Sequence, residues 1–184
     1  MSTAMYVGSF DPPTLGHADI AKRAAAQYDH VVIVIAYNPR KNGLFLPVER
    51  KEMLLRCLPG ARAVFLRADG ILMDETWNLP STAKYQVMVM EPGGLSVNLA
   101  KKVGATALVR GLRAVSDFDA EFQMALMNRE QTEDVDTVLF MTSKSHLFTS
   151  SSNVREVAAL GGNIDPFVEP FIKDLLAAKY GKAQ

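Results

Sequence analysis

The chain has 184 residues, enough for a single domain over residues 1–184, and its 20 Lys and Arg balance its 20 Asp and Glu. Zero net charge excludes a general attraction to nucleic acid or to an anionic membrane, so we expect neither as a partner. One cysteine excludes an intrachain disulfide or a cysteine metal site, and no apolar stretch approaches the roughly 20 residues that span a bilayer, so we expect a cytoplasmic protein.

In chain order, short apolar runs alternate with amphipathic stretches. Residues 31–36, 107–109 and 136–141 are too short for helices and predict strands. We expect helices over residues 16–28, 47–58, 96–103, 116–129 and 169–180, and a further helix that begins near Ser152 or Asn153. This order predicts an α/β fold with an open, doubly wound parallel sheet and right-handed crossovers, a Rossmann-like architecture.

One region interrupts this alternation. Residues 69–94 contain Pro80, Pro92 and the only tryptophan, Trp77. They also contain one short alternating stretch at residues 85–90, which is a candidate strand. A long irregular segment in a compact domain is usually functional or mobile. We therefore expect an excursion from the sheet, such as a hairpin or flap.

The loop after the first strand is the first candidate site, because ligands bind beyond the carboxyl ends of parallel strands. It runs from Gly8 to His17. Gly8 lets a phosphate approach the backbone, Ser9 supplies a hydroxyl, and His17 falls in the first turn of the next helix. The helix dipole disfavours a proton on His17 whereas a polyphosphate favours one, so the sequence leaves its charge open. The structural alternative is a proline-rich turn with a capping histidine.

Three other segments offer groups for phosphate. Arg110 and Arg113 flank a glycine just after an apolar strand, so their guanidinium groups can converge on the sheet edge. Residues 150–152 are serines before a helix, where free amides and hydroxyls hold an anion or simply cap the helix. Lys41 follows the second strand and can neutralise a substrate phosphate. Without further evidence, surface arginines and an exposed lysine are the alternatives.

Other polar and apolar residues have structural explanations. Phe122, Met124 and Met127 are expected to pack their helix against the rest of the chain. We find no acidic cluster of the metal-binding kind, and the carboxylates of residues 133–136 are expected to form a solvated turn.

The loop, GSFDPPTLGH, resembles the (T/S)xGH signature of the nucleotidyltransferase superfamily. Later segments are similar to bacterial phosphopantetheine adenylyltransferases: RGLRAVSDF at residues 110–118, Glu121, MNR at 127–129, and TSSS at 149–152 followed by Val154 and Glu156. The similarity covers nearly the whole chain except residues 69–94. It implies an enzyme that makes dephospho-coenzyme A and pyrophosphate from 4′-phosphopantetheine and ATP, with Mg²⁺ brought by ATP. It also implies a homohexamer and feedback by coenzyme A.

The resemblance also assigns site residues. Catalysis is expected from His17, as transition-state stabiliser, with Lys41 and Arg113. ATP is expected to contact Ser9, Phe10, His17, Gly111, Leu112, Arg113, Glu121, His146, Ser150, Ser151 and Ser152. The acceptor is expected to contact Ser9, Lys41, Ser96 and Arg110, with Leu95 beside Ser96.

We expect the acceptor phosphate to attack the α-phosphorus of ATP directly and in line, because the loop offers no activated nucleophile for a covalent intermediate. The alternatives are a nicotinate-mononucleotide adenylyltransferase and a non-catalytic nucleotide sensor on the same scaffold. A dehydrogenase is disfavoured because the loop lacks the three-glycine dinucleotide pattern.

Overall fold

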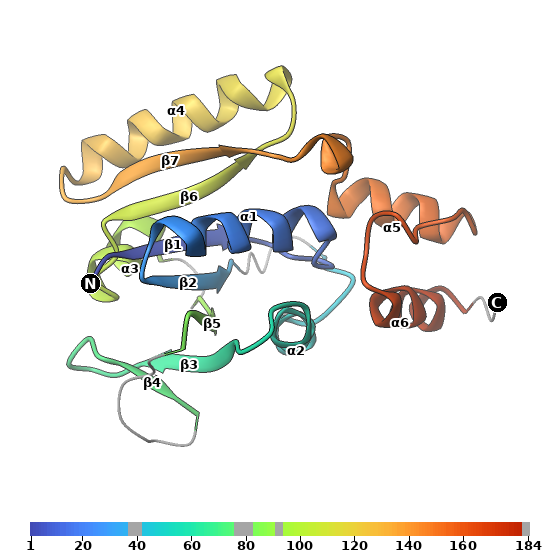
Figure 1. Ribbon diagram of the computed structural model, residues 1–184, viewed down its shortest axis with the longest axis horizontal. Helices are drawn as coiled ribbons and strands as arrows, with labels where there is room; N and C mark the ends of the chain where they lie inside the picture. Colours follow the sequence, from blue (N-terminus) through green and yellow to red (C-terminus); the bar gives the residue numbers. More distant parts are fainter. Residues whose placement is uncertain (37–41, 76–82, 91–93, 182–184) are drawn as a thin grey trace.

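One mixed sheet forms the centre of the molecule (Figure 1). The computed structural model describes residues 1–36, 42–75, 83–90 and 94–181. The strands are β1 (Thr3–Gly8), β2 (His30–Ile35), β3 (Arg62–Leu66), β4 (Leu72–Asp74), β5 (Tyr85–Val89), β6 (Ala107–Leu112) and β7 (Asp136–Met141). The helices are α1 (Leu15–Gln27), α2 (Pro47–Cys57), α3 (Ser96–Lys102), α4 (Val115–Gln131), α5 (Ser151–Ala159) and α6 (Pro170–Tyr180), with the short 3₁₀ helix η1 (Lys144–His146).

The seven strands lie in the order β4-β3-β5-β2-β1-β6-β7, and all neighbours are parallel except β3 and β4. The α/β class and the mostly parallel, doubly wound sheet are therefore confirmed. Strand β1 pairs with β2 on one side and with β6 on the other, so the direction of winding reverses beside β1. Such a reversal opens a crevice at the carboxyl edge of the sheet.

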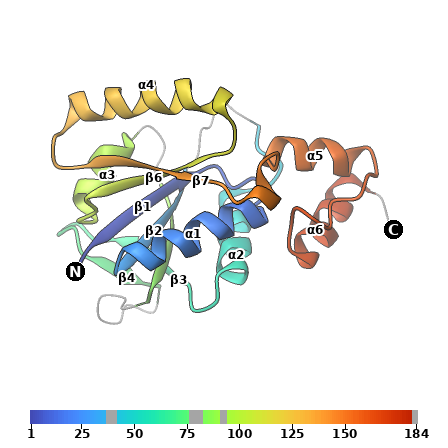
Figure 2. The same ribbon diagram turned by 45° about the horizontal axis from the view of Figure 1, so that its top comes forward.

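The central strands are apolar on both faces because helices cover both. In β2, Val31, Ile33 and Ile35 belong to one buried cluster, whereas Val32 and Val34 belong to a second. Figure 2 shows α1 and α2 on one face of the sheet and α3 and α4 on the other. In both views α5 and α6 lie beyond the carboxyl ends of the central strands. The continuous apolar runs of the sequence follow from this two-sided burial.

Residues 69–94 are not wholly an excursion from the sheet, because the candidate strand within them is confirmed. Residues 85–89 form β5, an interior strand that pairs with β2 and with β3. The antiparallel hairpin of β3 and β4 precedes it, so a hairpin is present, although the sequence did not predict β3. Trp77, Pro80 and Pro92 lie outside the described residues. The sequence did not show that β5 lies inside the sheet, because its two partners come from distant parts of the chain, which local patterning does not reveal.

The strand predicted at residues 107–109 extends further than expected. Strand β6 continues past residue 109 through Leu112, because Arg110 to Leu112 pair with Leu139 to Met141 of β7. Arg110 therefore lies within a strand, not after it. The predicted helices and the strands at residues 31–36 and 136–141 agree with the structure to within two residues at each end.

Helix α4 does not pack as expected. None of its residues is buried, and Phe122, Met124 and Met127 are 48%, 49% and 63% exposed. Phe118 stacks on Phe122 with ring centroids 5.6 Å apart, so these apolar side chains contact one another on the surface. The prediction that these residues pack the helix against the chain is wrong.

Across the described residues, we find no helix with both the length and the apolar character needed to cross a bilayer.

Candidate active site

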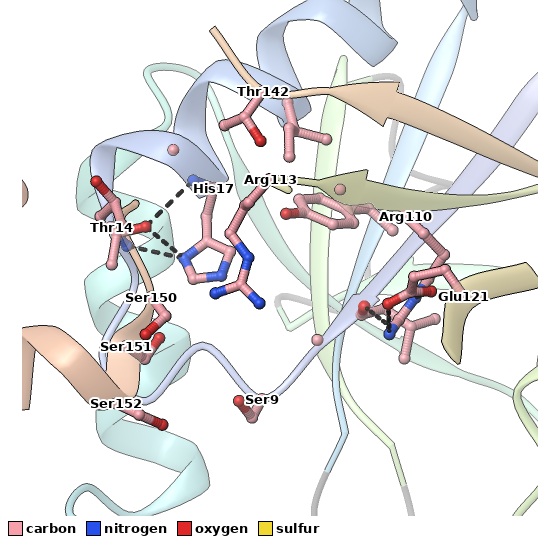
Figure 3. A pocket seen from close by; sticks show the side chains of 17 residues that line it. Ser9, Thr14, His17, Arg110, Arg113, Glu121, Thr142, Ser150, Ser151 and Ser152 are labelled. Carbon is pink, nitrogen blue, oxygen red and sulfur yellow. Dashed lines mark hydrogen bonds and ion pairs between the residues drawn. The ribbon is translucent and has the colours of Figure 1, made fainter. Parts of the chain in front are cut away.

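A cavity of about 310 Å³ lies where the sheet winding reverses. Its walls come from the end of β1 and the following loop, the start of α1, the end of β6, α4, the end of β7 and the start of α5. Figure 3 shows the side chains of this cavity, which converge from these segments. The predicted residues that line it are Ser9, His17, Arg110, Gly111, Arg113, Glu121, Ser150, Ser151 and Ser152. Segments up to about 140 positions apart in the sequence thus form one site.

The loop after β1 is built around a buried aromatic ring. Phe10 is fully buried, with φ 47°, and its ring packs edge-on against Tyr6 and against His17. A Cβ at Gly8 would lie 3.0 Å from this ring. The missing side chain of Gly8 therefore makes room for Phe10. Gly8 also lines the cavity, and its expected role in phosphate approach stays a prediction. A positive φ in a bulky residue is strained, and such conformations cluster at functional sites.

His17 is held in one tautomer. Thr14 caps α1, and its backbone N–H donates to His17 Nδ1 at 3.0 Å. Since a backbone N–H can only donate, Nδ1 accepts, and the proton of a neutral ring is on Nε2. Burial, with a smaller contribution from the nearby Arg113 cation, lowers the pKa of His17 to about 4. The protein surroundings of His17 therefore keep it neutral near pH 7, so that it presents one N–H donor.

The two predicted arginines differ in their contacts. Arg110 donates through Nε and Nη2 to Glu121, both at 2.7 Å, and through Nη1 to the carbonyl of Val7 at 2.9 Å. The hydrogen bond to Glu121 raises the pKa of Arg110. Arg113 forms a weaker pair with Asp117, at 3.1 Å from Nε, and its guanidinium points into the cavity beside His17 (Figure 3). Arg113 is thus the cation best placed to meet an anion in the cavity, whereas Arg110 is already bonded within the protein.

The serine turn joins the catalytic loop. Ser150 caps α5 by accepting from the N–H of Asn153 at 3.0 Å, and Ser151 Oγ donates to the carbonyl of Pro12 at 2.8 Å. The amides of Ser151 and Ser152 begin the helix, where backbone N–H groups have no intrahelical acceptor. This end of α5 therefore faces the cavity with donors and a positive dipole, and the predicted capping and anion-binding roles are compatible.

The absence of a side chain at Gly111 is explained by helix packing. A Cβ there would lie 2.4 Å from Cδ1 of Ile20, so the glycine allows α1 to approach β6 closely. This approach brings His17, on the same helix, to the wall formed by β6. Gly111 also lines the cavity.

The other predicted residues lie apart from this cavity. Phe10 is buried beneath it, and Leu112 and His146 are not among its described lining residues. Ser96 begins α3, and its neighbour Leu95 lines a second cavity of about 1000 Å³ between α3 and the ends of β3 and β5. Lys41 lies outside the described residues.

Two residues of the site were given no role from the sequence, although one of them, Thr14, lies in the predicted catalytic loop. Thr14 and Thr142 line the cavity, and Thr14 fixes the tautomer of His17. The spacing of Thr14 and His17, three residues apart before a helix, is that of a capping box, and this signal could have identified Thr14. Thr142 has no comparable local signal.

A protein cage for a metal ion is not evident. No group of three or more His, Cys, Asp or Glu side chains suited to a metal occurs among the residues that the structure describes.

Known proteins resemble this chain in sequence and fold. Residues 5–157 match the model of a family described as cytidylyltransferase-like. A phosphopantetheine adenylyltransferase of Desulfotalea psychrophila is 40% identical over 179 residues, which cover 97% of this chain and 93% of the relative. A protein of the same name from Heliobacterium modesticaldum is 40% identical over 181 residues, covering 98% and 94%.

A solved structure shows the same fold at much lower identity. The nicotinic acid mononucleotide adenylyltransferase of Plasmodium falciparum, complexed with NaAD, has a TM-score of 0.63 to this chain at 14% identity. The match covers 98% of this chain and 96% of that one.

Proposed function

This chain belongs to the cytidylyltransferase-like family, and we infer that it is an enzyme of coenzyme A biosynthesis that transfers the adenylyl group of ATP to 4′-phosphopantetheine. The products are dephospho-coenzyme A and pyrophosphate. The rival acceptor, nicotinate mononucleotide, is suggested by solved structures that share the fold with this chain at 14% to 17% identity. The two relatives at 40% identity are named phosphopantetheine adenylyltransferase, and this chain matches them over nearly their full length.

One observation carries the assignment of the chemistry to the cavity. The neutral His17 donor, the Arg113 cation and the amino end of α5 line the same cavity at the reversal of the sheet. Together they suit a polyphosphate whose charge increases during the reaction, because fixed donors and cations stabilise that charge without reorganising.

In the proposed reaction, an oxygen of the acceptor phosphate forms a bond to the α-phosphorus of ATP. The bond from that phosphorus to the bridging oxygen breaks on the opposite side, and the electron pair leaves with pyrophosphate. His17 Nε2–H donates to the α-phosphoryl oxygens as negative charge accumulates on them. Arg113 and the amides of Ser151 and Ser152 hold the β- and γ-phosphates. Orientation and charge stabilisation are sufficient for such transfers, without a covalent intermediate.

The remaining roles are proposals of the same kind. Ser9 is adjacent to both substrates, and Glu121 holds Arg110 at the cavity wall, where its charge contributes to the field at the acceptor phosphate. Lys41 is proposed as the second cation for that phosphate, and Ser96 as a contact of the acceptor. Phe10, Gly111 and Leu112 are proposed to act through their backbone beside ATP, and His146 through its ring. The cytoplasmic location remains part of the proposal.

Magnesium is proposed to enter with ATP. Glu121 is the one carboxylate among the described lining residues, and both its oxygens accept hydrogen bonds from Arg110. This donor set suits an ion held by the triphosphate more than one held by a protein cage, since Mg²⁺ in nucleotide sites takes most ligands from phosphate and water. When bound, the ion would neutralise charge on the leaving pyrophosphate.

The acceptor is tested by pyrophosphate release with ATP and either 4′-phosphopantetheine or nicotinate mononucleotide. We expect release with phosphopantetheine and at least a hundredfold lower kcat/KM with the nucleotide, because a site built for one polar acceptor leaves groups unpaired with another. Preference for the nucleotide would reassign the substrate. ATP binding without release with either acceptor would favour the nucleotide sensor.

We also propose that the chain assembles as a homohexamer through α4. Helix α4 carries a row of exposed apolar side chains at Phe118, Phe122 and Leu126, and such a row on an unburied helix is typical of an interface. Light scattering after size exclusion is expected to give six chains per particle.

Leu126→Glu is expected to reduce that mass, because a charge placed in an apolar contact loses its hydration. Val48→Glu on α2 is the matched control, since Val48 is 54% exposed and Leu126 is 53% exposed. A monomeric wild type, or an unchanged mass in Leu126→Glu, would contradict the interface.

A further inference from the structure

A buried carboxylate at Asp11 connects three segments around the cavity. Asp11 is 4% exposed and lies in the loop between Ser9 and His17. Its Oδ1 accepts from the backbone N–H of Phe45 and its Oδ2 from that of Leu44, both at 2.9 Å. Neither hydrogen bond is local, because residues 44 and 45 lie before α2.

Two arginines complete the surroundings of Asp11. Arg155 of α5 donates to Asp11 Oδ2 at 2.6 Å, and the buried Arg50 of α2 lies 3.4 Å from Oδ1. Arg50 also donates to the carbonyls of Phe45 and of Ser9, at 2.8 and 3.2 Å. A Cβ at Gly43 would lie 1.8 Å from Arg50 Nη2, so the space around this pair is fully used.

The Arg155 contact reaches the proposed ATP-binding turn. Nη2 of Arg155 lies 3.5 Å from Ser152 Oγ, while Nη1 is bonded to Asp11. The catalytic loop and the serine turn are thus joined by a charged pair in addition to the Ser151 hydrogen bond to Pro12. Neither Asp11 nor Arg155 lines the cavity.

We propose that Asp11 and Arg155 are positioning residues that hold the serine turn of α5 in register with His17 during adenylyl transfer. The pair fixes the β- and γ-phosphates, which the amides of α5 hold, and through them the α-phosphorus, relative to the donor on α1. Each half keeps its own binding groups when the pair is broken, so substrate affinity is retained while alignment is lost. A misplacement of about 1 Å can cost roughly a hundredfold in rate. This inference rests on the proposed function.

The test is a double-mutant cycle with Asp11→Asn, Arg155→Met and the double variant. Steady-state kcat and KM for ATP are measured with phosphopantetheine, and kcat is expressed per ATP-binding site counted by calorimetry. We expect each single variant to lower kcat about tenfold or more with KM for ATP within about threefold, and the double variant to be no slower than the slower single variant. Arg155→Lys, which keeps a cation near Asp11, is expected to recover most of the rate.

Lys173→Met is the matched control, because Lys173 has the same 28% side-chain exposure as Arg155 and pairs with an aspartate, Asp165, at 2.8 Å. It is expected to leave kcat and KM unchanged. Losses that add in the double variant would overturn the proposal, as would a raised KM for ATP with kcat intact, which indicates direct ATP binding by Arg155. A fall only in the number of ATP-binding sites would also overturn it, since that indicates loss of folding.

An activity-independent measurement separates this proposal from the proposed function. Amide exchange at Leu44 and Phe45, whose N–H groups donate to Asp11, is expected to be faster in Arg155→Met than in Lys173→Met. Unchanged exchange would overturn the linkage even in an active enzyme. If the wild type were inactive with both acceptors, the proposed function would be wrong. The amide exchange rates would still show whether Arg155 and Asp11 join the two segments.

Discussion

The His17→Ala variant is expected to turn over at least about a hundredfold more slowly than the wild type, with ATP affinity nearly unchanged. The ring is neutral and held by Thr14, so its Nε2–H is available to the transition state without prior deprotonation. Loss of one such donor typically lowers kcat by about 10² to 10³. The measurement is single-turnover pyrophosphate release at saturating ATP and phosphopantetheine.

The control for His17→Ala is His30→Ala. His30 begins β2 and contacts Ala83 and Gln86 away from the cavity, so its removal tests for a general effect of losing a histidine. We expect near-normal turnover in His30→Ala. Near-normal turnover in His17→Ala would refute the role of His17 as transition-state donor.

The second large effect is expected at Arg113. Replacing it with methionine keeps much of the side-chain length but removes the cation that points into the cavity beside His17. The contacts of Arg113 with Asp117, at 3.1 and 3.4 Å, are longer than those of Arg110 with Glu121, both at 2.7 Å. Truncating a charge that meets an opposite charge in a desolvated site costs about 2 to 5 kcal/mol. We expect kcat/KM for ATP to fall at least about a hundredfold. Initial rates over a range of ATP concentrations measure this.

Arg129→Met provides the comparison. Arg129 pairs with Asp136 at 3.2 Å, as Arg113 pairs with Asp117 at 3.1 Å, but it lies at the far end of α4 from the cavity. We expect less than about a twofold effect there, because exposed pairs contribute little. A similar loss in both variants would attribute the effect to α4 as a whole, and a normal Arg113→Met would remove Arg113 from the mechanism.

Contacts within the protein hold much of this arrangement. Thr14 orients His17, and Glu121 holds Arg110. Such preorganisation reduces the reorganisation required during reaction, which is the main source of electrostatic catalysis. The contacts around Asp11 are proposed to preorganise the site in the same way, by fixing the relative position of whole segments and not only of single side chains.

For Arg110, residue type and position in the sequence predicted the location of the side chain but not its hydrogen-bond partners. Its position after an apolar run suggested a guanidinium free to bind phosphate, and its side chain does reach the cavity. The structure places it within β6, where Glu121 of α4 occupies two of its donors and Val7 of β1 a third. The sequence does not show which carboxylate pairs with Arg110, because the position of Glu121 depends on how α4 packs against the sheet.

The sequence by itself determined the features that depend on neighbours a few residues apart. Short apolar runs identified β2 and β7, and the loop from Gly8 to His17 was recognisable from its own sequence. The segments at residues 110–118 and 149–152 were identified in the same way. These predictions succeeded because helix periodicity, capping and β-branched runs are local interactions.

Only the tertiary structure decided the features that join distant segments. Strand β5 became an interior strand by pairing with β2, and the apolar row of α4 stayed exposed because no other element of the described chain covers it. Asp11 acquired partners 33, 34 and 144 residues away. The loop from Gly8 to His17 therefore specifies its own turn and cap, whereas its alignment with the serine turn depends on contacts that exist only after the sheet has brought those segments together.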